Sequence, residues 1–162
     1  MVVARTTHPR PIGPDAAADS LVERIEAGGK GAQVVHREAV QIDGRDGRSL
    51  EIRVSLGGEW QVVRALVTTA GVYAYRTQFQ AVEKAMDRYR PLADRLFAQA
   101  RITEPEELQY ARERAQIHPR SWQPAVELGD ALYRTGRPAL AMAEYARALA
   151  LSPGNTDAVV GR

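Results

Sequence analysis

The stretch that decides the fold is Ser49-Leu-Glu-Ile-Arg-Val-Ser-Leu56. Apolar and polar residues alternate along it, so that Leu50, Ile52 and Val54 share one face of an extended chain. Alternation of this kind is typical of a β-strand with one face against a core and the other in water. We therefore expect an antiparallel sheet near the centre of the chain.

Turn sequences divide the chain on both sides of this strand. Asp43-Gly-Arg-Asp-Gly-Arg48 precedes it and favours the positive φ angles that a hairpin turn requires. Gly57-Gly58 and Ala70-Gly71 mark the next two turns. The extended segments that these turns separate are residues 33–42, 49–56, 59–69 and 72–79. They are predicted to form a four-stranded antiparallel meander.

Apolar residues at helical spacing lie before and after the predicted sheet. Residues 15–27 are predicted to form a short amphipathic helix that Gly28-Gly29 ends. Residues 82–100 carry an apolar stripe, interrupted by Pro91, and this helix is expected to cover the apolar face of the sheet. Residues 1–14 contain Pro9, Pro11 and Pro14 and are predicted to form a flexible arm.

The last third of the chain is predicted to be all helix. Helices are expected over residues 106–117, 124–135 and 138–151, with breaks at His118-Pro119 and Gly136. The expected fold class is α+β: a four-stranded meander covered by helices and followed by an all-α helical hairpin region. The expected divisions are an arm (1–14), an α+β domain (15–102) and a helical region (103–162).

Composition argues against several classes of partner and location. The formal net charge is +2, and the acidic and basic residues are balanced in each half of the chain, so we expect no nucleic-acid partner. No apolar run reaches the roughly 18 residues of a membrane span, and the N-terminus lacks the apolar core of a secretion signal. The chain as given is therefore expected to be cytoplasmic, or extracytoplasmic if it is a mature or truncated form.

No motif predicts catalysis, a metal or a cofactor. Cysteine is absent, which excludes thiolate catalysis and cysteine-based zinc sites, and His8, His36 and His118 lack the spacing of a helical zinc site. Gly28-Gly-Lys-Gly31 lacks the spacing of a phosphate loop, and Asp43-Gly-Arg-Asp-Gly47 lacks the later Glu of a calcium loop. We expect a non-enzymatic protein without cofactors.

Two groups of side chains leave alternatives open. The predicted helix after the sheet carries Lys84, Arg88 and Arg95 on one face, which is either a solvated surface with mixed ion pairs or a docking face for an acidic partner. Aromatic residues in the predicted α+β domain either belong to the core or line a ligand pocket between sheet and helix. These aromatic residues are Trp60, Tyr73, Tyr75, Tyr89 and Phe97.

Residues 122–155 span 34 positions, the period of the tetratricopeptide repeat (TPR), and resemble one such repeat. Leu128-Gly129 matches the Leu-Gly pair of the repeat, and its small-residue, aromatic and terminal proline positions are also matched. Those matches are Ala141, Ala148, Tyr145 and Pro153. Ala125 and Leu132 depart from the usual Trp and Tyr. A degenerate unit that ends at Pro119 precedes this repeat.

The TPR resemblance implies a partner-binding surface on the first helix of the repeat. In this family a peptide lies along the concave face, which the resemblance assigns here to Gln123, Glu127, Asp130 and Arg134, with Tyr133 nearby. The family's carboxylate clamp requires Lys and Asn where this chain has Val126 and Asp130, which argues against chaperone tails as partners. Repeats stack on neighbours, so the unfinished unit at 156–162 predicts an uncapped C-terminal end.

A second resemblance covers residues 21–102, which are similar to the latter half of PsbP-like domains. It rests on the order of elements, on Ile42-Asp43-Gly44, on Gly71-Val-Tyr-Ala-Tyr75 and on Tyr89-Arg-Pro-Leu-Ala-Asp-Arg-Leu-Phe97. The resemblance implies a binding or assembly module without a catalytic centre. The chain lacks most of the N-terminal β-hairpin usual in such domains.

These patterns predict a non-enzymatic adaptor that binds a protein or peptide partner through its repeat, with self-association through the uncapped end as a further possibility. One alternative is an accessory or regulatory part of a larger enzyme or secretion assembly. Another is a small-ligand-binding PsbP-like domain, which requires a cavity of roughly 300 Å³ or more between sheet and helix.

Overall fold

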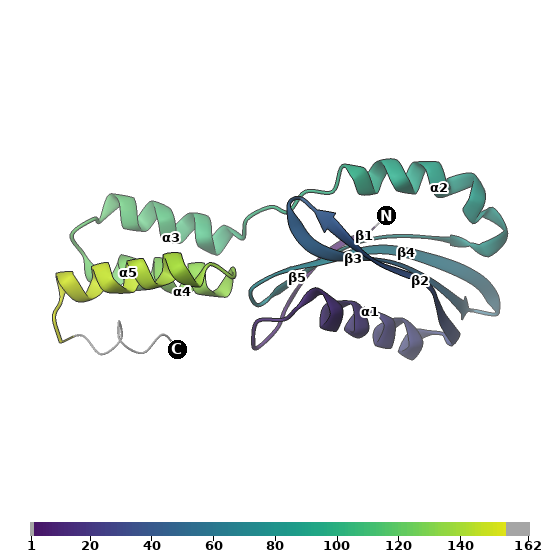
Figure 1. Ribbon diagram of the computed structural model, residues 1–162, viewed down its shortest axis with the longest axis horizontal. Coiled ribbons are helices and arrows are strands. Elements are labelled where there is room, and N and C mark those ends of the chain that lie inside the picture. The colour runs from purple at the N-terminus through teal and green to yellow at the C-terminus, as the bar shows by residue number, and fades with distance from the viewer. Residues whose placement is uncertain (1, 155–162) are drawn as a thin grey trace. The chain divides into compact units, whose positions relative to one another are not determined.

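The structure is a computed structural model in which residues 2–154 are described. Its elements are β1 (Val2–Thr7), α1 (Pro14–Gly28), β2 (Lys30–Ile42), β3 (Arg45–Leu56), β4 (Glu59–Ala70), β5 (Tyr73–Val82), α2 (Glu83–Ala98), α3 (Glu106–Ile117), α4 (Trp122–Arg134) and α5 (Pro138–Leu151) (Figure 1). Two compact units can be separated. One contains residues 2–69 and 73–102, and the other contains residues 70–72 and 103–154.

The first unit is built on a five-stranded sheet with the strand order β1-β5-β4-β3-β2. The expected four-stranded meander was therefore wrong, because residues 2–7 pair with β5 instead of forming part of a flexible arm. The antiparallel register runs from Val2 opposite Gln78 to Thr7 opposite Tyr73. All three prolines of the expected arm follow Thr7 and leave the strand intact, since Pro9 and Pro11 lie in the connection and Pro14 begins α1.

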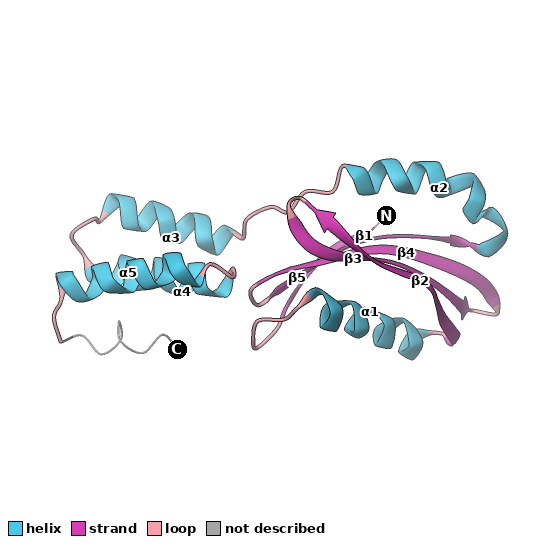
Figure 2. Ribbon diagram, viewed as in Figure 1, coloured by secondary structure: helices cyan, strands magenta, loops and turns pink. Residues whose placement is uncertain are grey.

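Helix α1 covers the apolar face of this sheet, and α2 lies on the opposite side (Figure 2). Ala17, Ala18 and Leu21 of α1 share one core cluster with Leu50, Ile52 and Val54 of β3 and with residues of β4 and β5. The expectation that the second helix would cover the apolar face was wrong. Helix α2 instead meets charged side chains of the sheet, as in the hydrogen bonds from the Arg53 guanidinium to the Glu83 carboxylate.

The hairpin between β2 and β3 uses only the first of the two Asp-Gly pairs as its turn. Asp43 and Gly44 have φ angles of 52° and 73°, in the left-handed region that such turns require. The second glycine, Gly47, lies within β3. A Cβ there would stand 2.6 Å from Cδ1 of Ile42 and 2.8 Å from the carbonyl oxygen of Val67, so packing explains this glycine.

The second unit contains α3, α4 and α5, which share a core formed by Leu108, Ala111, Leu132, Ala141, Tyr145 and neighbouring residues. A Cβ at Gly129 would overlap the Tyr145 ring, so the glycine allows α4 and α5 to approach closely.

The expectation of a purely helical second region was also wrong. Residues 70–72, the turn after β4, belong to the same compact unit, in which the Val72 amide donates a hydrogen bond to the Arg134 carbonyl oxygen at 2.9 Å. Residues 155–162, which hold the expected unfinished repeat and uncapped end, lie outside the described residues.

Candidate functional site

The five residues predicted to bind a partner all belong to α4. Gln123, Asp130, Tyr133 and Arg134 are exposed, and Glu127 is half-buried. Residues 123, 127, 130 and 134 recur at helical spacing and therefore share one face of α4. The opposite face is buried through Ala125, Leu128, Ala131 and Leu132, which explains why only one side of the helix is free to meet a partner.

Three of these five side chains are already engaged within the second unit, and one of them, Gln123, accepts a hydrogen bond from the Ser121 hydroxyl at 2.5 Å. Nη1 of Arg114 donates to both carboxylate oxygens of Glu127, at 2.8 and 2.7 Å. The Tyr145 hydroxyl donates to Oδ1 of Asp130 at 2.8 Å. Burial, with the Asp130 carboxylate as the next cause, raises the pKa of Tyr145, so its hydroxyl stays a donor. Glu127 and Asp130 thus hold α4 to its neighbours, which leaves Tyr133 and Arg134 more available to a partner.

Exposed apolar side chains on α3 and α5 form a feature that the sequence patterns did not identify. Tyr110 and Ile117 of α3 are 61% and 69% exposed, and Leu140 and Met142 of α5 are 55% and 66% exposed. They are the four most exposed large hydrophobic residues among residues 4–154. The sequence could have identified them, since on each helix they lie outside the row of residues that is buried. We call these four residues with Tyr133 the helical apolar surface.

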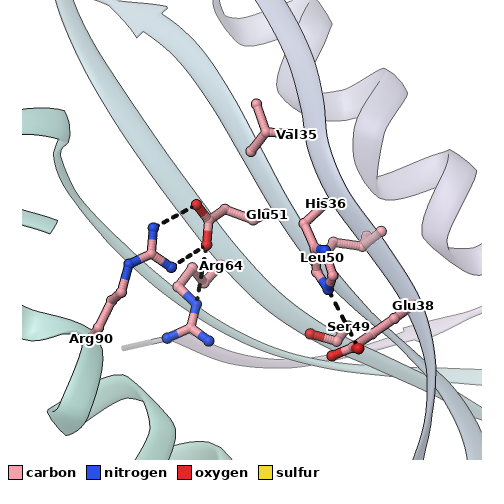
Figure 3. Close-up of a pocket in the computed structure, with 8 residues that line it drawn as sticks. All are labelled: Val35, His36, Glu38, Ser49, Leu50, Glu51, Arg64 and Arg90. Carbon is pink, nitrogen blue, oxygen red and sulfur yellow. Dashed lines mark hydrogen bonds and ion pairs between the residues drawn. The ribbon is translucent and has the colours of Figure 1, made fainter. Parts of the chain in front are cut away.

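The first unit contains a charged pocket of about 400 Å³ (Figure 3). Its lining residues come from β2, β3, β4 and α2, and are Val35, His36, Glu38, Ser49, Leu50, Glu51, Arg64 and Arg90. Nη1 and Nη2 of Arg90 donate to the two carboxylate oxygens of Glu51 at 2.6 and 2.8 Å. These hydrogen bonds hold the pKa of Glu51 below its usual value.

The other charges of this pocket are also paired. Nε of Arg64 lies 3.5 Å from Glu51, and Nη1 of Arg64 lies 2.7 Å from Asp94. Nε2 of His36 lies 3.5 Å from the Glu38 carboxylate (Figure 3). A pocket in which the described charges compensate one another has room for a ligand but presents no activated nucleophile or base.

The aromatic residues do not line this pocket. Tyr73 is buried, whereas Trp60 and Tyr89 are each 39% exposed. The guanidinium of Arg53 lies over the Trp60 ring at 4.0 Å from its centroid, and that of Arg64 lies 5.6 Å from the Phe97 centroid. The five aromatic residues therefore neither share one core nor line one pocket.

The glycine-lysine run at residues 28–31 connects the end of α1 to the start of β2. It borders a concavity of about 490 Å³ lined by Ala27, Gly28, Gly29, Lys30, Ser55, Gly57 and Gly58. The C-terminal end of a helix carries partial negative charge, so this position disfavours phosphate. Across residues 2–154, no group of three or more His, Asp or Glu could hold a metal ion.

No helix in the described part of the chain is long and apolar enough to cross a membrane. No family model and no curated protein matches the sequence. Among solved structures, the chain is similar to the crystal structure of PA94 from Pseudomonas aeruginosa, a protein of unknown function. The identity is 15%, the TM-score is 0.49, and the match covers 64% of this chain and 84% of PA94.

Proposed function

We propose that this chain is a non-enzymatic adaptor that binds a protein or peptide partner through α3, α4 and α5. The observation that carries the proposal is the helical apolar surface, since the four most exposed large hydrophobic residues between positions 4 and 154 all lie on α3 and α5. Exposed apolar side chains that gather on one unit are typical of interaction sites. The TPR resemblance of residues 122–155 supports the same assignment.

Charge narrows the class of partner. Glu127 and Asp130 are engaged by Arg114 and Tyr145, while the side chain of Arg134 forms no ion pair with any described residue. The α4 face therefore offers one uncompensated positive charge next to the aromatic ring of Tyr133. We expect a partner segment with an apolar anchor and an acidic residue, since the anchor buries against the ring and the acid pairs with the guanidinium.

A photo-crosslinking experiment tests this proposal. A photoreactive phenylalanine analogue replaces Tyr133 in the full chain, and the same analogue replaces Tyr89 of the first unit as a control. The two tyrosines are similarly exposed, at 45% and 39%. We expect a discrete adduct in the native host from position 133 and none from position 89. The charge reversal Arg134→Glu is expected to reduce the yield at position 133 several-fold.

The identity and behaviour of the adduct separate the competing assignments. An adduct with a second copy of this chain assigns the surface to self-association. Light scattering on the purified protein then shows whether it forms an oligomer. An adduct with an enzyme or secretion component makes the chain an accessory subunit of that assembly. Equal yields at positions 133 and 89, or yields indifferent to Arg134→Glu, would contradict the proposal.

The charged pocket favours a second candidate function, the binding of a small ligand. Its volume of about 400 Å³ lies in the range of ligand sites, and its lining carries both signs of charge, so a zwitterion such as a free amino acid fits it best. Calorimetric titration with a panel of amino acids tests this. Binding that Glu51→Gln weakens at least tenfold supports the candidate, and the absence of heat with every member contradicts it.

A further inference from the structure

Two arginines of the first unit that have no acidic partner among the described residues line one recess, whereas Arg10, Arg45, Arg88 and Arg95, which also have none, do not line it. Arg24 lies on α1, and Arg76 lies on β5. Neither side chain forms a hydrogen bond or an ion pair with any residue between positions 2 and 154. Six other arginines of this unit pair with carboxylates, namely Arg37, Arg48, Arg53, Arg64, Arg90 and Arg101. The charges of Arg24 and Arg76 are therefore uncompensated within the described residues.

Both arginines face the same recess between α1 and the sheet. Arg76 follows Ala74 by two residues on β5 and so shares the face that packs under α1, and Arg24 continues the helix face of Ala17 and Leu21. The recess is lined by Thr6, His8, Ala17, Ser20, Leu21, Arg24, Val67, Ala74 and Arg76. Arg24 is exposed at its rim, and Arg76 is half-buried inside it.

The inner part of the recess holds a donor without an acceptor. Nε of Arg76 is shielded from solvent and has no hydrogen-bond partner. A buried donor left without an acceptor is destabilising, and more so when it belongs to a charged group. The volume of the recess is about 20 Å³, enough for a single water-sized atom between its lining residues.

The surroundings of Arg76 are unfavourable to its positive charge. Burial, and then the nearby charge of Arg24, lowers the pKa of the Arg76 guanidinium. The remaining polar groups of the lining are the hydroxyls of Thr6 and Ser20 and the imidazole of His8, none of which supplies a fixed negative charge. An anion placed between the two guanidiniums would compensate both positive charges and remove their repulsion.

We propose that this recess binds the carboxylate group of a ligand. One carboxylate oxygen fits the inner volume and accepts from a terminal nitrogen of the Arg76 guanidinium, while the other lies toward the rim and accepts from Arg24. The narrow recess favours a planar carboxylate over a tetrahedral phosphate, since its inner volume admits only one atom. Guanidinium and carboxylate groups form the strong, charge-assisted hydrogen bonds that this geometry suits.

NMR titration of the full chain tests the proposal by following the guanidinium group of Arg76. The Nε–Hε resonance of Arg76 is followed while sodium acetate is added at pH 7, with sodium chloride and sodium phosphate at matched ionic strength as comparisons. We expect saturable shifts with acetate at millimolar concentrations, the affinity open to so small a ligand. Binding of phosphate or chloride as tight as that of acetate would overturn the assignment to a carboxylate.

Three lysine variants separate a specific site from general attraction of anions. Arg76→Lys and Arg24→Lys keep the charge but remove the planar donor set, whereas Arg95→Lys changes an exposed arginine of α2 as a control. Backbone amide shifts of Thr6 and Ser20 report binding in all three. We expect acetate affinity to fall at least tenfold in the first two variants and to stay unchanged in the third. Equal losses in all three, or no loss at Arg24, would overturn the proposal.

N-acetylglycine, a mimic of a peptide C-terminus, distinguishes two sources of the carboxylate. Tighter binding than acetate supports the site and assigns it to a chain terminus. Equal binding supports the site and assigns it to a small carboxylic acid. If Arg76→Lys fails to fold, as shown by circular dichroism, Arg24→Lys keeps the test complete because it leaves the Arg76 resonance in place. Failure of acetate to cause any saturable shift up to about 100 mM contradicts the proposal, since even the weakest specific site of this kind binds in that range.

Discussion

Glu51 shows how a single residue joins elements of the first unit. Its side chain is only 16% exposed and projects from β3 toward Arg90 of α2 and Arg64 of β4. Charged contacts of this kind help to hold α2 on the face of the sheet opposite α1, together with its buried residues Met86 and Ala93. A carboxylate with two guanidinium neighbours is stabilised in its ionised form, which makes the contribution of Glu51 dependent on pH.

We expect Glu51→Gln to lower the free energy of unfolding by about 1–2 kcal/mol near pH 7, because it weakens charge-assisted hydrogen bonds to a partly exposed partner. The folded-state pKa of Glu51 lies below its usual 4.5, so its stabilisation is fully present above that value and is lost as the pH falls through the folded-state pKa. Urea titrations from pH 3 to 7 should show the two proteins converging only below about pH 4.5. A difference independent of pH would contradict this account.

Gly129 is the residue on which the approach of α4 to α5 depends. Gly129→Ala would force its Cβ into the Tyr145 ring, whose hydroxyl is fixed by Asp130. We expect a net loss of about 1–2 kcal/mol, since overpacking costs about 1–3 kcal/mol and the better helix propensity of Ala returns up to about 1 kcal/mol.

Gly28→Ala is the matched control for this substitution. Gly28 is the last residue of α1, and a Cβ there would have nothing within 4 Å. Denaturant unfolding should therefore show little or no loss for Gly28→Ala. If the Gly129→Ala variant is as stable as the unaltered protein, the Tyr145 ring moves aside easily and the prediction is wrong.

At the scale of elements, β1 is a strand that closes one edge of the sheet. It pairs antiparallel with β5 over residues 2–7, and without it the β5 edge would present unpaired backbone groups. An edge strand has a neighbour on one side only, so alternate backbone amides of β1 point toward β5. Proline, which has no amide hydrogen, can therefore probe this pairing one residue at a time.

We expect one of the two substitutions Val3→Pro and Ala4→Pro to destabilise the sheet edge and the other to be tolerated. The damaging substitution removes a hydrogen bond to β5 and should accelerate exchange of β5 amide protons at least about tenfold, or about 1.4 kcal/mol. Hydrogen exchange measured by NMR on both variants gives the answer. If neither changes exchange in β5, residues 2–7 do not pair there.

At the scale of the whole molecule, the described core clusters fall within one unit or the other. The cluster under α1 uses residues of the first unit, and those of α3, α4 and α5 use residues of the second. Separate cores predict separate cooperative transitions. The two tryptophans report on them individually, since Trp60 lies in β4 and Trp122 in α4.

Single-tryptophan variants test this separation. Trp122→Phe leaves fluorescence from Trp60 alone, and Trp60→Phe leaves that from Trp122 alone. We expect Gly129→Ala to shift only the denaturation midpoint that Trp122 reports, and Glu51→Gln only the midpoint that Trp60 reports. A shift of both midpoints by either substitution would show that the two units unfold as one.

Local patterns predicted the position and type of many elements. The alternation in 49–56 is part of β3, the glycine turns separate the strands, and the helical spacing at 15–27 matches α1 closely. These features succeed because the period of apolar residues and the φ angles of turns are properties of short segments. The same reasoning placed Gln123, Tyr133 and Arg134 on an exposed face of α4, whereas their role in binding stays a prediction.

The sequence by itself determined the position and type of most strands, helices and turns, with β1 as the exception, and the apolar faces of β3 and α1. Only the tertiary structure decided that β1 closes the edge of β5, that α1 rather than α2 covers the apolar face, and that Asp130 is held by Tyr145. It also brought Arg24 and Arg76 to one recess. The physical reason is that a periodic pattern fixes the direction of a side chain but not its partner, which depends on packing between segments far apart in the chain.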